Sequence, residues 1–164
     1  RGSHRKNAPM DVRVRSAEQV ELDQLQSALG FLLRIAQLKV FQQYFMQPGE
    51  DRLKPGEFSV LWVIKCNPGI RQSLLCQRLM IKRAHMTKLI RALEERGWVA
   101  RRIPDEDRRG VELTLTAEGE AAVADAAEGF FAFENTVGSE LNASEREQLM
   151  VLLRKLVNIK GSGL

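Results

Sequence analysis

Apolar residues recur at helical spacing over most of the chain. Between residues 16 and 46 they return every three or four positions, and Pro48 and Gly49 end the pattern. The spacing predicts one long N-terminal helix over residues 16–46. Its apolar stripe is rich enough that we expect partners on more than one side.

Shorter helical patterns occupy the middle of the chain. Pro55 fits the first position of a second helix, which Asn67, Pro68 and Gly69 end. A short helix is predicted over about 72–79 and a fourth over about 83–96. Gly97 then has the place and type of a residue that closes a helix in the left-handed conformation.

Two extended runs follow, at residues 98–103 and 111–116. The second alternates apolar and polar positions, and turn-forming residues 104–110 connect the two runs. This pattern predicts a β-hairpin with a long tip.

Two further helices are expected at the C-terminal end. Thr116 can cap a helix that runs to about Val137, and Ser144 with Glu147 has capping-box spacing before a last helix. This order of elements predicts a mainly α fold with a small β-hairpin wing, a winged helix-turn-helix flanked by long terminal helices. We expect a tag remnant and disordered N-terminus (1–15), an N-terminal dimerisation helix (16–46), a winged DNA-binding domain (50–116), C-terminal dimerisation helices (117–160) and a frayed tail (161–164).

Positive charge is concentrated in the centre of the sequence. Residues 71–109 carry 11 Lys and Arg against 5 Asp and Glu, whereas residues 110–164 carry 4 against 9. Such a segment can be a solvated surface, but a cationic helix beside a cationic hairpin has the geometry that meets DNA. We therefore expect the fourth helix to lie in the major groove of double-stranded DNA.

The groove-facing positions of that helix fall between its apolar ones. The candidates are Lys82, Arg83, His85, Thr87, Lys88 and Arg91. We expect Arg83 and His85 to approach bases, and Lys88 and Arg91 to contact the DNA backbone. In the hairpin, Arg102 and Arg108 are expected at phosphates.

The terminal helices carry more apolar surface than one small winged domain can cover. Such surface usually marks an interface, so we expect a two-fold homodimer on a pseudo-palindromic site, with recognition helices roughly 34 Å apart. The alternative is a monomer whose terminal helices pack on its own core.

Several motifs resemble those of the MarR family of bacterial transcriptional regulators. The run L-x-x-L-E-E-R-G-W-V-x-R is followed by P-D-E-D-R-R-G and L-T-L-T-A-E-G, and the resemblance covers about residues 20–160. It implies a dimeric DNA-binding regulator, by default a repressor. It also implies that Arg109 enters the minor groove and that Asp107 orients it, as in the family's D-x-R pattern.

The resemblance further implies a small aromatic or phenolic ligand, often anionic. Phe31, Arg34, Phe58 and Trp62 are candidates to line its cleft, with Arg34 facing a carboxylate, although aromatic residues at helical spacing are often core. A cysteine-based redox sensor of the same family is the alternative. Cys76 fits a buried inert thiol, Cys66 lies near a helix C-terminus where the dipole disfavours a thiolate, and the first helix has no cysteine.

Other classes of function find little support in the sequence. With His4 assigned to the tag remnant, His85 is the remaining histidine, and no metal cluster, catalytic pair or phosphate-binding loop is apparent. We therefore expect no catalysis, cofactor, metal or membrane span, and place the protein in the bacterial cytoplasm at the nucleoid. A winged helix used for protein contact stays an alternative, but it would not need the basic face.

Overall fold

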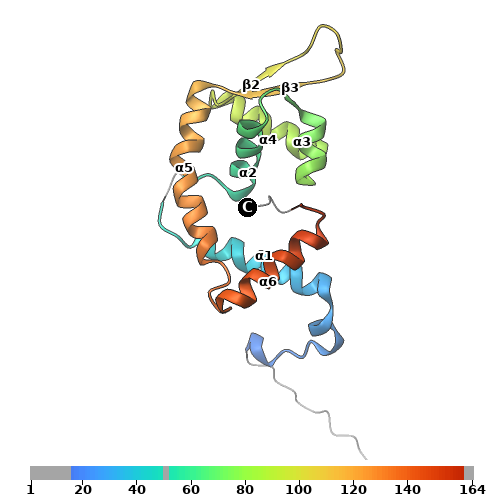
Figure 1. Cartoon of the computed structure of the whole chain (residues 1–164), viewed down its shortest axis with the longest axis vertical. Helices are drawn as coiled ribbons and strands as arrows, with labels where there is room; N and C mark the ends of the chain where they lie inside the picture. The colour runs from blue at the N-terminus through green and yellow to red at the C-terminus, as the bar shows by residue number, and fades with distance from the viewer. Residues whose placement is uncertain (1–15, 50–51, 161–164) are drawn as a thin grey trace, which may run out of the picture. The chain divides into compact units, whose positions relative to one another are not determined.

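The order of elements is that of a winged helix-turn-helix, which confirms the mainly α fold with a small β-sheet (Figure 1). The computed structural model describes residues 16–49 and 52–160, so the predicted disordered N-terminus and frayed tail lie outside it. The helices are α1 (Leu29–Phe45), α2 (Pro55–Cys66), α3 (Gln72–Leu79), α4 (Arg83–Glu95), α5 (Ala117–Thr136) and α6 (Ala143–Leu156), and the strands are β1 (Ile70–Arg71), β2 (Val99–Arg102) and β3 (Glu112–Leu115). The chain divides into two compact units, residues 1–43 and 44–164, and each is described by itself.

The first unit corrects the prediction of one continuous helix over residues 16–46. Two short 3₁₀ helices, Ala17–Gln19 and Asp23–Ser27, come first, and α1 begins only at Leu29. Asp23 has a left-handed φ of 46°. Helices draw most of their stability from packing, and in the single chain the large apolar side chains of this segment are exposed, namely Val20, Leu22, Leu25 and Leu29. The hydrophobic period therefore appears in the sequence without a continuous helix in this segment.

The second unit has a continuous apolar core. It joins side chains of α2, α3, α4, α5 and the sheet, among them Leu61, Leu75, Ile90, Leu113 and Val123, all at most 1% exposed. α2 begins at Pro55 as predicted, and the Glu57 carboxylate accepts a hydrogen bond from the Lys54 amide at 3.1 Å. The winged domain and α5 thus close one core within this unit.

The sheet has three antiparallel strands in the order β1-β3-β2, one more than the predicted hairpin. β1 is only two residues long and pairs Ile70 with Leu113 and Arg71 with Glu112. A two-residue strand has no period to detect in a sequence. Its pairing with β3 nevertheless fixes the start of α3 beside the wing.

The junction between the wing and α5 depends on close packing. Gly97 has a φ of 73°, and the Trp98 amide donates to the Leu93 carbonyl, so α4 closes as predicted. The Thr116 hydroxyl accepts from the Gly119 amide at 3.0 Å, which confirms its capping role. A Cβ at Gly119 would lie 2.0 Å from the Trp98 carbonyl oxygen. Only glycine lets α5 approach the sheet this closely.

The cap of the last helix lies two residues earlier than predicted. Asn142 and Glu145 form the capping box, in which each side chain accepts the other's main-chain amide, at 3.0 and 2.9 Å. The prediction of Ser144 with Glu147 was wrong: both pairs have the same spacing, and the structure places Asn142 at the cap. Among the described residues, no helix has the length and apolar character to cross a membrane.

Candidate nucleic-acid interface

Helix α4 presents one buried and one charged face. Met86, Ile90 and Leu93 recur at spacings of four and three and are at most 1% exposed. Because these positions are turned to the core, the residues between them face outward. The six predicted contact residues, Lys82, Arg83, His85, Thr87, Lys88 and Arg91, are all exposed, with Lys82 as the residue before the first helical turn.

The turn before α4 sets the direction of this helix. Met80 has a left-handed φ of 52°, and the amide of Ile81 donates to the Cys76 carbonyl at 3.0 Å. Within α4, the Thr87 hydroxyl donates to the Arg83 carbonyl at 2.9 Å and accepts from the Gln72 amide nitrogen at 3.4 Å. Thr87 therefore has partners on α4 and α3.

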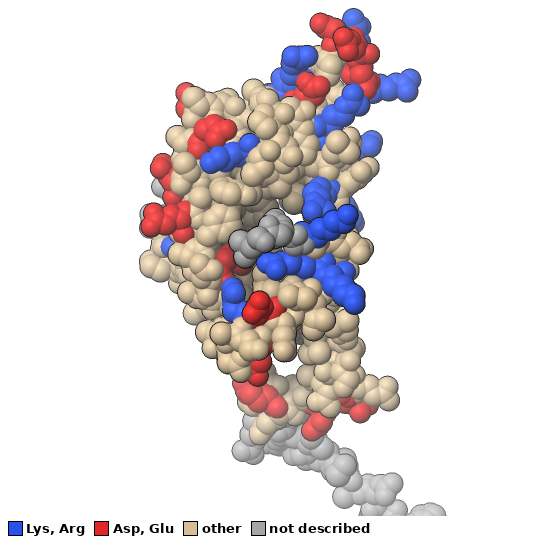
Figure 2. Space-filling view, viewed as in Figure 1, with Lys and Arg blue, Asp and Glu red and all other residues tan. Residues whose placement is uncertain are grey.

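The wing carries basic residues on β2 and on the connecting loop. Arg102 lies 3.7 Å from Glu112 in an ion pair across the two strands, and Arg108 and Arg109 are exposed in the loop. Figure 2 shows basic side chains on the wing and along the edge below it, with acidic side chains beside them at the wing tip. A mixed-charge tip restricts which side of the loop can approach a polyanion.

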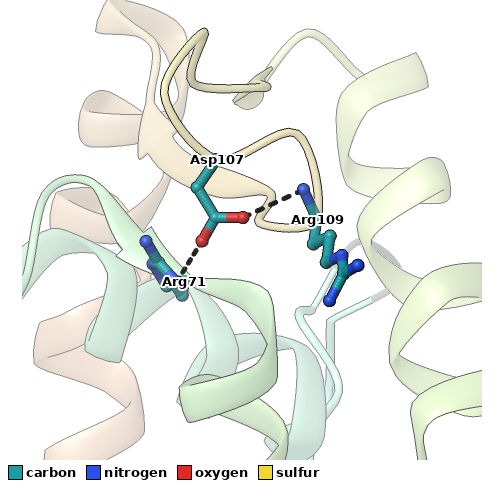
Figure 3. A network of polar contacts seen from close by, with 3 residues as sticks. All are labelled: Arg71, Asp107 and Arg109. Atoms are coloured by element: carbon teal, nitrogen blue, oxygen red, sulfur yellow. Dashed lines mark hydrogen bonds and ion pairs between the residues drawn. The ribbon is translucent and has the colours of Figure 1, made fainter.

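Asp107 organises the loop through two different partners. One carboxylate oxygen accepts from the main-chain amide of Arg109 at 3.2 Å, and the other lies 2.9 Å from the Arg71 guanidinium. The side chain of Arg109 points away from Asp107 (Figure 3). The predicted relation between Asp107 and Arg109 therefore runs through the Arg109 backbone in this structure, and Arg71 is a residue that the sequence did not single out.

The predicted ligand-cleft residues are divided between the two units. Phe58 and Trp62 of α2 stack at 5.6 Å between ring centroids, and Phe58 stacks on Phe130 of α5 at 4.0 Å. Phe58 is only 2% exposed, so it is part of the core. Phe31 and Arg34 belong to the first unit.

A groove that sequence reasoning did not indicate lies along α5. It has a volume of about 480 Å³ and includes Tyr44, Arg52, Trp98 and Phe130 in its walls. Burial raises the pKa of Tyr44, whose hydroxyl donates to the Leu53 carbonyl. Because the Tyr44 hydroxyl already donates this hydrogen bond within the chain, Tyr44 contributes to the wall of the groove as a structural residue.

The two cysteines have different surroundings. Cys66 is exposed at the end of α2, while Cys76 is half-buried against the core of the winged domain. Both thiols are free. No group of three or more His, Cys, Asp or Glu suited to a metal ion occurs within residues 16–49 and 52–160.

Comparison with known proteins places these elements in a recognised family. The model of the MarR family matches residues 53–111. A protein of Thauera aromatica, provisionally named as the regulatory protein for the hcr operon, is 32% identical over 129 residues, which cover 78% of each chain. The transcriptional repressor CouR, solved on a 23-mer DNA duplex, has a TM-score of 0.75 and 31% identity over 85% of this chain and 99% of its own. BpsR of Bordetella bronchiseptica, described with regulation of its DNA binding by 6-hydroxynicotinic acid, has a TM-score of 0.72 and 26% identity over 78% and 97%.

Proposed function

The chain belongs to the MarR family of DNA-binding transcriptional regulators, and from this premise we propose that it is a dimeric repressor released from its operator by a small aromatic acid. It is a regulator and not an enzyme. The observation that carries the proposal is the outward basic face of α4 beside the arginine-bearing wing.

The proposed contacts divide the work between α4 and the wing. Arg83 and His85, near the N-terminal end of α4, approach base edges in the major groove, and Lys88 and Arg91 contact phosphates. Arg109 enters the adjacent minor groove, where a narrow A·T-rich segment concentrates negative potential. Arg102 and Arg108 lie at phosphates beside it.

Dimerisation is proposed for α1 and for the C-terminal helices. α1 exposes Leu32, Ile35 and Leu38, and α6 exposes Leu152 and Leu156, each between 42% and 62%. Exposed apolar side chains at helical spacing favour association with a second copy, because isolated chains rarely leave such stripes in water. Two-fold symmetry would then require a pseudo-palindromic operator.

Repression and ligand release are supported by the relatives. CouR is named as a repressor, and the DNA binding of BpsR is regulated by 6-hydroxynicotinic acid. We propose that the ligand is an aromatic acid, because a guanidinium such as that of Arg34 can bind a carboxylate through paired hydrogen bonds. As a regulator of transcription, the protein would work in the bacterial cytoplasm beside the chromosome.

Selection of bound duplexes from a random DNA pool tests the central proposal. We expect an inverted repeat with half-sites about one helical turn apart, and sedimentation of the protein as a dimer. Recovery of no preferred sequence, or a monomer that binds one half-site, would contradict it.

Thermal shift with aromatic acids, 6-hydroxynicotinic acid among them, then tests the ligand, since a binder raises the melting temperature. A ligand that raises it without weakening operator binding would contradict release.

A further inference from the structure

Arg71 stands at a fixed point between the two DNA-binding elements. It pairs with Glu112 across β1 and β3, while the Gly69 amide donates to the Leu113 carbonyl and the Gln72 amide to the Val111 carbonyl, both at 2.8 Å. Main-chain hydrogen bonds on both sides of Arg71 hold its backbone against the base of the wing. Gln72, the next residue, reaches Thr87 on α4.

From this point the Arg71 side chain reaches into the wing loop. Its guanidinium lies 2.9 Å from the Asp107 carboxylate, and that carboxylate also accepts from the Arg109 amide at 3.2 Å (Figure 3). Gly110 is buried beside it, so that a Cβ there would lie 3.5 Å from the guanidinium carbon. Arg71 therefore contacts the loop at Asp107, two residues before Arg109, and lies next to Gly110, the residue after it.

The loop has further hydrogen bonds, but these shape it from within. The Asp107 amide donates to the Pro104 carbonyl at 3.3 Å, and the Gly110 amide donates to the Asp107 carbonyl at 3.0 Å. They fold the loop without tying it to β1. The Arg71–Asp107 pair is half-exposed and weak as a source of stability, but it joins the folded loop to β1.

We propose that Arg71 is a positioning residue for DNA binding: through Asp107 it fixes the wing loop relative to α4 and so sets where the Arg109 guanidinium meets the duplex. This inference rests on the proposed role of Arg109 in the minor groove. Arg71 is itself occupied by Asp107, whereas the Arg109 side chain is directed away from this pair.

A double-mutant cycle separates positioning from a direct phosphate contact. Operator affinity is measured for Arg71→Gln, Arg109→Ala and the double variant on a duplex recovered by selection. We expect losses of about fivefold for Arg71→Gln and about tenfold for Arg109→Ala, and about tenfold for the double variant, because a mispositioned loop matters only while Arg109 is present. A loss near fiftyfold in the double variant would show independent action and overturn the inference.

Arg101→Gln is the matched control for loss of a positive charge. Arg101 forms an ion pair with Glu94, also at 2.9 Å and with similar exposure, but it does not reach the wing loop. We expect less than a twofold loss for this variant. If it weakens binding as much as Arg71→Gln does, the effect belongs to net charge and the inference fails.

Amide hydrogen exchange without DNA gives a readout that a direct contact would not change. Arg71→Gln should speed exchange at the Arg109 and Gly110 amides and leave the melting temperature and the α2 amides unchanged. Unchanged exchange in the loop would overturn the inference.

If Arg109→Ala alone leaves affinity unchanged, the wing part of the proposed function has failed and the inference with it. If Arg109→Ala weakens binding and Arg71→Gln does not, the inference alone is wrong.

Discussion

The winged domain and α6 use the same kind of hydrophobic pattern in opposite ways. In α2, Phe58, Leu61 and Ile64 are at most 2% exposed, whereas in α6 Leu149, Val151, Leu152 and Leu156 are 43% to 62% exposed. Helical spacing of leucines therefore indicates a face that needs covering, but not what covers it. In the winged domain the same chain covers it. In α6 we attribute the cover to a second copy, and four experiments probe this difference.

The largest expected effect lies where α5 enters the winged domain. Gly119→Ala should lower the free energy of unfolding by about 3 kcal/mol, because its Cβ would lie 2.0 Å from the Trp98 carbonyl and the helix must move. Thermal or denaturant unfolding measures the loss. Gly129→Ala, on the same helix, is the control: a Cβ there meets nothing within 4 Å, so it should stabilise by about 0.5–1 kcal/mol. Equal effects at the two sites would refute the close approach.

Breaking the proposed dimer should have the next largest effect. Leu152→Gln is expected to raise the dissociation constant of the dimer about thirtyfold, as loss of an interface hot spot of about 2 kcal/mol would. Stability of the single chain should change little, since Leu152 is 62% exposed. Sedimentation across a concentration series measures the constant. The control is Arg154→Gln on the same helix. If the Leu152→Gln protein unfolds but does not dissociate, Leu152 belongs to a core instead of an interface.

Arg109→Ala should weaken operator binding about tenfold, or about 1.4 kcal/mol, and leave the dimer intact. Its side chain is exposed, so folding should not suffer. A fluorescence-anisotropy titration at several salt concentrations measures both the affinity and its salt dependence. If the guanidinium displaces counterions from the DNA, the slope of log affinity against log salt concentration should be shallower for the variant. Unchanged affinity would remove the wing from the DNA contact and leave α4 as the sole reader.

The features that could be predicted from the sequence are those whose cause is local. Gly97 ends α4 and Thr116 caps α5 because each signal lies within a few residues of its effect. Asn142 and Ser144 both offer a capping box, and local spacing could not rank them. Arg71 was not predicted as a site residue because its partner, Asp107, comes near only when β1 pairs with β3.

The same distinction explains the candidate interface. The outward positions of α4 follow from the spacing of Met86, Ile90 and Leu93, so the six recognition-helix candidates could be identified as exposed without a structure. The segment before α1 could not be predicted in the same way. Its stripe has helical spacing, but helix formation there depends on contacts that the sequence pattern does not contain.

The smallest predicted effect concerns Glu134, where α5 ends before α6. Burial raises the pKa of Glu134, and Arg146 offsets this only in part. The folded state therefore binds the proton more tightly than the unfolded chain, so this stabilisation is present below the ordinary pKa of 4.5 and is lost as pH rises through the raised value. At neutral pH the carboxylate disfavours the fold.

Glu134→Gln should accordingly raise the melting temperature by about 1 °C at pH 7, with a difference that closes below pH 4.5. Arg146 keeps its hydrogen bonds to the Glu134 and Val137 carbonyls, because these acceptors belong to the main chain. Melting curves from pH 4 to pH 7 measure the change, with exposed Glu128→Gln on the same helix as control. A lower melting temperature at pH 7 would mean that attraction to Arg146 outweighs the cost of burial. The end of α5 would then be held by charge, unlike the apolar closure of the winged domain.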